Sequence, residues 1–193
     1  MKKDLYIFGL WLGDKYWWGS SIGLVNTKLE ITKKFVKFLK EVGFSIEKIK
    51  VQIRAKNPIN KKKFAKILKV KETNIHFSQL KKGNKTQITV YVNSRKFKRE
   101  FIKETRTIRE KIKTKKELIE YLRGRFDADG HFDPKKKRIR IAYTTLEEAK
   151  ADASLIQRII KEKPKVVFYK KANEAILELI GEKWKNLIFS IIK

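Results

Sequence analysis

The chain has 193 residues, enough for one sizeable core or for two small halves that share one. Lys and Arg number 49 against 21 Asp and Glu, so the formal net charge is +28. This surplus indicates a polyanionic partner. The alternative, a thermophile surface with ion-pair networks, would need nearly equal numbers of acids and bases. The absence of cysteine excludes disulfides, thiolate zinc sites and cysteine nucleophiles.

In the first part of the chain, apolar residues at helical spacing predict helices and alternating polar and apolar residues predict strands. The predicted elements are, in order, a helical segment at 3–13, a strand at 20–26, a helix at 28–42, a strand at 49–54, a short helix from Asn57-Pro58 to about Leu68, a strand at 73–80, a turn at Gly83-Asn84, a strand at 87–92 and a basic helix at about 96–112.

The second part of the chain gives a shorter series by the same criteria. It comprises a helix at 115–128, a strand at 137–143, a helix at 146–162, strands at 165–171 and 174–180 joined by a hairpin at Ala172-Asn173, and a last short helix at 183–192. Helices mixed with strands in this order predict an α+β protein.

Three of the predicted strands have an outward face that mixes basic groups with amide and hydroxyl groups. Lys and Arg suit phosphates, while Gln and Arg can read base edges. One such strand is usually an ordinary solvated face, but three with the same bias predict a nucleic-acid-binding surface with steeply salt-dependent affinity. The residues are Lys50, Gln52 and Arg54, then Gln87, Thr89 and Tyr91, and finally Arg138 and Arg140.

The two parts of the chain repeat each other. The segment 9–14 (Gly-Leu-Trp-Leu-Gly-Asp) and the segment 124–129 (Gly-Arg-Phe-Asp-Ala-Asp) both place small residues four apart and end in an acid. Each is followed by a turn, a strand and an apolar helix, and each of those helices is predicted to open with a capping box, at Thr27–Glu30 and Thr144–Glu147. The ordered set of matches indicates two related halves.

Small residues four apart lie on one helix face and let another backbone come close, although such a spacing is often ordinary packing. If the two strips pack together, Asp14 and Asp129 end up side by side at helix C-termini, whose partial negative charge adds to theirs. A cation between them would relieve the repulsion, and oxygen ligands favour Mg²⁺ or another hard divalent ion such as Mn²⁺. Such a centre can hydrolyse a phosphodiester. The strip residues are Gly9, Gly13, Gly124 and Ala128.

Residues 122–130, Leu-Arg-Gly-Arg-Phe-Asp-Ala-Asp-Gly, resemble the LAGLIDADG motif that names a family of homing endonucleases. Residues 7–15, Ile-Phe-Gly-Leu-Trp-Leu-Gly-Asp-Lys, resemble the divergent first copy of two-motif members. The resemblance covers nearly the whole chain as halves at 1–113 and 114–193, apart from an apparent insertion at about 57–85.

The resemblance implies two pseudo-symmetric αββαββα halves whose motif helices form the interface and whose antiparallel sheets make a saddle over DNA. It assigns divalent-metal binding to the last acid of each motif, Asp14 and Asp129, and a role in the motif turn to Asp127. The implied activity is cleavage of both DNA strands across the minor groove at a long target, by a monomer.

Two departures from the motif bear on cleavage. Lys15 stands where the motif usually has Gly, so it must tolerate the turn, and its ammonium could compete with the metal for Asp14. Thr27 and Thr144 stand near positions where active members carry Lys, Gln or Arg. The alternative is therefore a family member without cleavage, such as an RNA-splicing maturase or a DNA-binding regulator.

Other cations can stabilise charge at the scissile phosphate, and the candidates are Lys28 and either Arg138 or Arg140. The expected partner is double-stranded DNA, with RNA possible. No apolar run approaches a membrane span, and the mean hydropathy is −0.50, so no membrane partner is expected. We expect a cytoplasmic prokaryotic protein, associated with the nucleoid when bound; zero Cys and few Gln point to a hot habitat.

Overall fold

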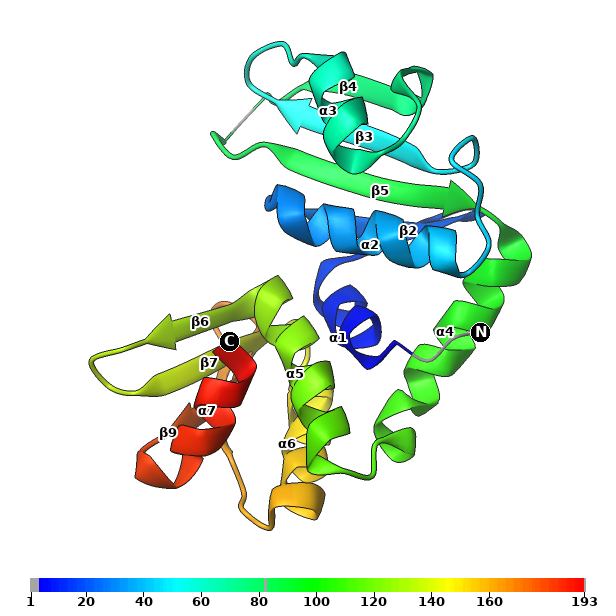
Figure 1. Cartoon of the computed structure of the whole chain (residues 1–193). Helices are drawn as coiled ribbons and strands as arrows, with labels where there is room; N and C mark the ends of the chain where they lie inside the picture. The colour runs from blue at the N-terminus through cyan, green and yellow to red at the C-terminus, as the bar shows by residue number, and fades with distance from the viewer. Residues whose placement is uncertain (1–3, 82, 193) are drawn as a thin grey trace. The chain divides into compact units, whose positions relative to one another are not determined.

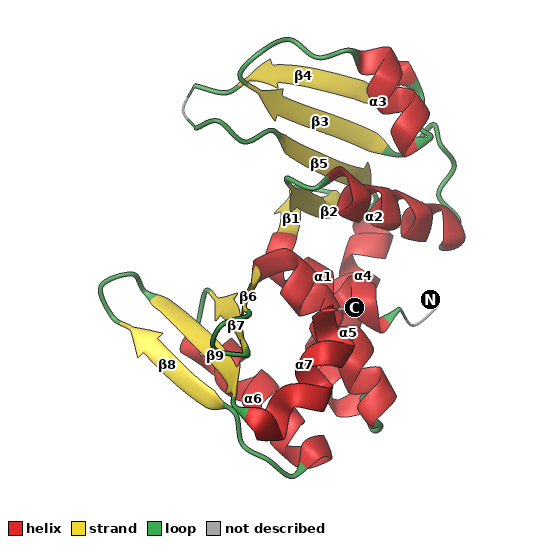
Figure 2. Ribbon diagram, turned by 60° about the vertical axis from the view of Figure 1, so that its left-hand side comes forward, coloured by secondary structure: helices red, strands yellow, loops and turns green. Residues whose placement is uncertain are grey.

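The computed structural model describes residues 4–81 and 83–192, which form an α+β fold with two β-sheets (Figures 1 and 2). The chain divides into two compact units, one made of residues 14–102 and the other of residues 4–13 with the chain from 103 onward. These units differ from the sequence halves at 1–113 and 114–193, because the first motif helix packs with the second half.

The first unit contains a five-stranded sheet in the order β1-β2-β5-β3-β4, in which only the β3–β4 pair is parallel. Its elements are β1 (Lys15–Trp18), β2 (Ser21–Asn26), α2 (Leu29–Glu41), β3 (Lys50–Ala55), α3 (Lys61–Leu68), the 3₁₀ turn η1 (Glu72–Asn74), β4 (Ile75–Gln79), β5 (Gln87–Asn93) and the start of α4 (Arg95–Lys111).

Alternation along the strands decides which face of this sheet is covered. Leu24 of β2 and Val90 of β5 are paired on one face and fully buried, and α2 packs on these two strands through residues such as Phe35 and Leu39. The helix α3 packs beside α2 (Figure 2). The opposite face of the sheet carries the alternate residues, which are mostly polar.

The predicted insertion at 57–85 contains α3, η1 and β4. Together they add β4 to the sheet edge beside β3. The pair is parallel because a helical crossover returns the chain to the same end of the sheet. The helix α3 begins after Asn60, whose side chain accepts a hydrogen bond from the Lys63 amide, so the predicted start at Asn57-Pro58 was wrong.

The second unit contains a four-stranded antiparallel sheet in the order β6-β7-β9-β8. Helix α6 packs on β7, β8 and β9, while α5 contacts β7, α6 and α7. Its elements are most of α1 (Leu5–Asp14), the end of α4, α5 (Lys115–Asp129), β6 (Gly130–Asp133), β7 (Arg138–Tyr143), α6 (Leu146–Ile160), β8 (Lys165–Tyr169), β9 (Glu174–Ile180), the 3₁₀ turn η2 (Glu182–Trp184) and α7 (Lys185–Ile192).

The two capping boxes predicted from the sequence do not form at the predicted residues. Helix α6 is capped by Thr145, whose side chain accepts from the Glu148 amide, so the predicted box at Thr144–Glu147 is displaced by one residue. Helix α2 has Lys28 at its N-cap with no side-chain cap bond, so the predicted box at Thr27–Glu30 does not form. A reciprocal capping box opens α5 instead, between Thr114 and Glu117.

Within the described part of the chain, none of the helices has the length and apolarity needed to cross a lipid bilayer.

A buried ionic network joins four elements of the second unit around Asp152 of α6, which is 0% exposed. Its carboxylate accepts hydrogen bonds from the hydroxyls of Tyr121 (2.9 Å) and Tyr143 (2.7 Å) and from Arg109 Nε (2.6 Å). The Arg125 guanidinium lies 3.6 Å from the same carboxylate and stacks over the Tyr143 ring. Since Arg125 and Tyr121 belong to α5, this network fixes the second motif helix against α4, α6 and β7.

We predict that Asp152→Asn lowers the free energy of unfolding by about 3–5 kcal/mol, because it leaves the buried Arg125 and the partly exposed Arg109 without their counter-charge. Chemical denaturation of the whole chain measures this loss. Glu147→Gln on the exposed side of the same helix removes an equal charge and is the control, expected within about 0.5 kcal/mol of wild type. Equal stabilities for the two variants would contradict a structural role for the network.

Candidate functional site

Helices α1 and α5 of the second unit approach each other closely at their glycines. A methyl group added at Gly9 would overlap the carbonyl oxygen of Tyr121 and lie 3.1 Å from the Arg125 amide nitrogen. A methyl group added at Gly124 would overlap the carbonyl oxygen of Tyr6 and lie 2.6 Å from the amide nitrogen of Leu10. Each glycine therefore faces backbone of the other helix, and neither position has room for a Cβ atom.

The second pair of small residues lies one turn further along the same contact. A Cβ atom at Gly13 would lie 2.5 Å from Ala128 Cβ and 2.6 Å from Asp129 Oδ2. The exposed carboxylate of Asp129, the last residue of α5, therefore lies beside Gly13. In the sequence, Asp14 is the next residue after Gly13.

A hydrogen bond further ties the two motif helices together. The Tyr6 hydroxyl of α1 donates to Asp127 Oδ2 of α5 at 2.5 Å. Burial raises the pKa of Tyr6 well above its ordinary value, and the bond to Asp127 raises this pKa further, so the hydroxyl stays protonated as a donor. Asp127 thus lies in the last turn of α5 and bonds to α1, and its role in the motif turn stays a prediction.

In the first unit, the Asp14 carboxylate is oriented by a residue that the sequence analysis did not single out. Asn26, at the end of β2, donates its side-chain amide to Asp14 Oδ2, and its own oxygen accepts from the Lys28 amide nitrogen at 2.6 Å. Lys28 is the N-cap residue of α2 and is exposed. An Asn where a strand passes into a helix is the one signal in the sequence for this arrangement.

Lys15 does not strain the backbone as expected from the motif. It is the first residue of β1, and it is not among the described residues with a positive φ. The corresponding Gly130 also has an ordinary φ of −90° and is crowded instead by the ring of Phe126. The preference for glycine in this motif position is therefore steric in the second copy, and a lysine is tolerated in the first.

The chemistry of these donors suits a hard cation, since Asp14 and Asp129 each end a motif helix and present oxygen ligands. Across residues 4–81 and 83–192, no group of three or more His, Asp or Glu side chains gathers to form a complete protein cage. A metal ion at either carboxylate would therefore take its remaining ligands from water and phosphate, as Mg²⁺ usually does.

The helix-free face of the first sheet brings together the polar residues of β3 and β5. In the antiparallel register, Lys50 lies opposite Tyr91 and Arg54 lies opposite Gln87. Gln52 lies opposite Thr89, which is only 5% exposed, so the role of Thr89 in ligand contact stays a prediction. The remaining five residues are at least partly exposed.

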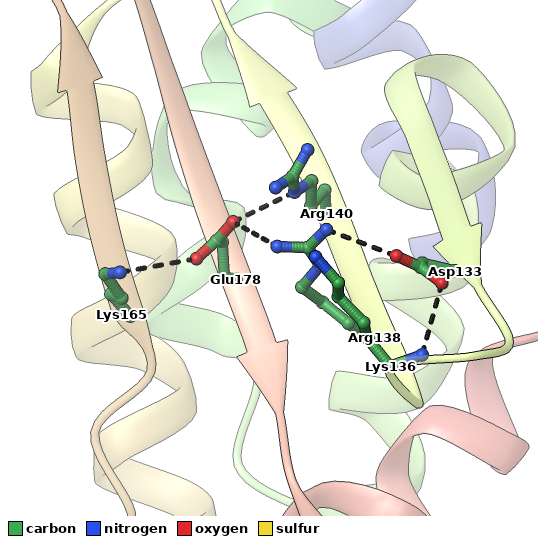
Figure 3. A network of polar contacts seen from close by, with 6 residues as sticks. All are labelled: Asp133, Lys136, Arg138, Arg140, Lys165 and Glu178. Carbon is green, nitrogen blue, oxygen red and sulfur yellow. Dashed lines mark hydrogen bonds and ion pairs between the residues drawn. The ribbon is translucent and has the colours of Figure 1, made fainter.

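The second sheet presents its two arginines already paired with acids, as Figure 3 shows. Glu178 of β9 is 5% exposed and receives Arg140 Nε at 2.9 Å, Arg138 Nη1 at 3.4 Å and Lys165 Nζ at 3.7 Å. Arg138 also pairs with Asp133 at 3.3 Å, and a hydrogen bond from the Lys136 amide lowers the pKa of that carboxyl. The cations at this face are therefore fixed in position and partly neutralised.

Comparison with known proteins agrees with this architecture. Residues 116–183 match the family model of the LAGLIDADG-like domain. No functionally curated sequence matches the chain. Among solved structures, mesophilic variants of the homing endonuclease I-DmoI match with a TM-score of 0.62 at 16% identity, over 98% of this chain and 94% of that one.

Two further structures extend the comparison. The complex of I-DmoI with DNA and manganese matches with a TM-score of 0.63 at 16% identity, over 98% of this chain and 96% of that one. The N-terminal LAGLIDADG domain of DUF199/WhiA matches with a TM-score of 0.60 at 10% identity, over 98% of this chain and 82% of that one.

The fold is thus that of the single-chain homing endonucleases, with two sheets and a pair of glycine-lined helices, and the predicted fold class is confirmed. Residues 116–183 thus match a LAGLIDADG-like domain, and the chain as a whole shares its fold with I-DmoI.

We predict that Gly124→Ala lowers the free energy of unfolding by at least about 2 kcal/mol, because the added methyl group meets backbone that cannot move aside. This loss outweighs the gain of about 1 kcal/mol that Ala has over Gly in a helix. Thermal or denaturant unfolding measures it, with Glu120→Ala on the exposed face of α5 as the control. A stabilised Gly124→Ala variant would show that the helices do not meet at this residue.

Proposed function

We propose that this chain is a site-specific endonuclease that hydrolyses both strands of duplex DNA with a divalent metal ion. The observation that carries the proposal is the backbone contact of Gly9 and Gly124, since it sets Gly13 against the acid that ends the second motif helix. The fold of I-DmoI, a homing endonuclease solved with DNA and manganese, supports the same assignment.

In this proposal, Asp14 and Asp129 hold Mg²⁺ or Mn²⁺. When bound, the ion supplies the Lewis acidity that activates water and stabilises the leaving oxygen of the phosphodiester. Asn26 orients the Asp14 carboxylate through its amide hydrogen bond. Asp129 is the last residue of α5, where the helix dipole disfavours an unneutralised anion and so favours a bound cation.

Cations of the chain would neutralise charge at the scissile phosphate. Lys28 is exposed at the start of α2. It follows Thr27 and lies two residues after Asn26, which orients Asp14. The side chain of Arg140 is 36% exposed, whereas that of Arg138 is 12% exposed and paired with two acids, so Lys28 and Arg140 are the better candidates.

The substrate proposed is double-stranded DNA, bound on the outward faces of the two sheets by a monomer. The formal charge of +28 supplies the attraction to phosphate, and the amide and guanidinium groups of Gln52, Arg54 and Gln87 supply base-edge contacts. Such a protein would work in the cytoplasm and lie on the nucleoid when bound.

We predict that Asp129→Asn abolishes cleavage while leaving DNA affinity within about threefold of wild type, because it removes a metal ligand without removing a phosphate-binding cation. The measurement is selection of cleaved sites from a randomised duplex library with Mg²⁺ or Mn²⁺, followed by cleavage and binding assays on a selected site. Asp127→Asn is the control, since Asp127 bonds to Tyr6, and it should retain cleavage. Cleavage by Asp129→Asn at the wild-type rate would overturn the metal assignment.

A second candidate is a DNA-binding protein of the same fold without cleavage. The observation that favours it is the pairing of Arg138 and Arg140 with Glu178, which reduces the charge they can offer a phosphate. The fold likeness to the LAGLIDADG domain of DUF199/WhiA is compatible with it. Wild-type protein that binds duplex DNA tightly but cleaves no member of the library with either metal would select this candidate.

We predict that Glu178→Gln increases affinity for non-specific duplex DNA at low salt and steepens its salt dependence. The variant releases Arg138, Arg140 and Lys165 from a shared carboxylate, and each added phosphate contact changes the slope of log K against log salt by about −0.9.

Glu174→Gln is the matched control, because Glu174 lies on the same strand and sheet face and carries the same charge. Fluorescence-anisotropy titrations at several salt concentrations measure both variants. If the two slopes coincide, the Glu178 network does not restrain the arginines from phosphate.

A further inference from the structure

Two neighbouring tryptophans stand exposed at the tip of the β1–β2 hairpin. Trp17 is 47% exposed and Trp18 is 80% exposed, whereas Trp11 and Trp184 are each 2% exposed. Large aromatic side chains are normally well buried, and an exposed one next to a basic surface marks a contact site.

The two tryptophans lie on opposite faces of the sheet, because successive side chains of a strand alternate. The Trp17 ring lies under Lys98 Nζ of α4, 5.8 Å from its centroid, on the face that the helices cover. Trp18 shares its face with Tyr16, whose ring packs on that of Tyr91 with centroids 5.5 Å apart. Trp18 therefore stands on the polar, helix-free face of the sheet.

Hydrogen bonds hold the tip of this hairpin in place. Lys98 Nζ donates to the carbonyl oxygen of Gly19 at 2.8 Å, and the Ser94 amide donates to the carbonyl oxygen of Ser20 at 3.0 Å. The Ser21 hydroxyl donates to Asn93 Oδ1 at 2.6 Å. Trp18 therefore belongs to an ordered hairpin, and its indole is exposed before any partner binds.

The surroundings of Trp18 identify the chemistry of the partner. The five strands of this sheet contain no Asp or Glu, while their outward positions include Lys50, Arg54 and Gln52. In the strand register, the Trp18–Ser21–Asn93 row is followed by the Tyr16–Gly23–Tyr91–Lys50 row, so aromatic and cationic groups adjoin. A partner with anionic groups and flat aromatic faces matches both, and nucleic acid has this combination.

Gly23 shows how the aromatic part of this face is built. A Cβ atom at Gly23 would lie 2.6 Å from Tyr91 Cβ and would overlap the carbonyl oxygen of Val90. The missing side chain leaves space over β2, across which Tyr16 and Tyr91 meet. Trp18 therefore projects beside the packed rings of Tyr16 and Tyr91, which are half-buried and fixed in position.

We propose that Trp18 is a base-contacting residue, whose indole packs against a base step of the bound duplex while the neighbouring cations contact phosphates. This inference rests on the proposed function, namely that this sheet face binds DNA. Aromatic and apolar side chains that enter a groove act in this way, largely independently of sequence.

The test uses the full chain and a synthetic duplex of mixed sequence, followed by intrinsic tryptophan fluorescence. We expect DNA to quench the wild-type emission, Trp17→Phe to keep most of that quenching, and Trp18→Phe to lose it. We also expect Trp18→Ala to weaken DNA affinity by about tenfold. The salt slope should stay unchanged, because no phosphate-binding cation is removed. Trp17→Ala is the matched control, with an affinity close to wild type.

The possible failures can be told apart. If wild type binds the duplex and the Trp18 variants bind and quench like it, the inference about Trp18 is wrong and the proposed function stands. If wild type binds no duplex even at low salt, the proposed function itself fails. If Trp18→Ala alters self-association in sedimentation while DNA affinity is unchanged, Trp18 is a protein contact and the inference is overturned. Circular dichroism confirms that each variant is folded.

Discussion

The steric contact between the backbones of α1 and α5 is the constraint on which the candidate site depends. Because Gly9 and Gly124 each face backbone of the other helix, the contact fixes the separation of the helices and also their axial register. The bond from Tyr6 to Asp127 and the approach of Gly13 to Asp129 follow from that register. A side chain at either glycine would move the end of α5, and with it the Asp129 carboxylate that we propose as a metal ligand.

Much of this arrangement could be predicted from local spacing. Small residues four apart predicted the helix strips, and strict alternation predicted most of the strands. Spacing did not identify the N-cap of α6, because Thr144 and Thr145 each precede a Glu by three residues. Only the backbone geometry selects Thr145 as the cap. Spacing also failed for β1 and β6, four-residue strands that begin directly at the end of a helix and are too short to show a period.

The network around Asp152 was not predictable, and the reason is physical. Its partners come from α4, α5 and β7, so no spacing within one element reports them. From the sequence, Arg125 in the motif segment is indistinguishable from the many surface cations of this basic chain. In the structure it is 1% exposed and paired with a buried carboxylate. The Asn26 bond to Asp14 is of the same kind, since it joins residues on different elements.

The charge surplus of the chain is distributed unequally between its sheets, and this bears on recognition. The strands of the first sheet contain no acid, whereas those of the second contain Asp133, Glu174 and Glu178. On the first sheet, cations and aromatic rings are available for phosphates and bases. On the second, the arginines are fixed by carboxylates, so they gain geometric precision and lose net charge. If the chain binds DNA as proposed, non-specific attraction comes mainly from the first unit, and directional contacts from the second.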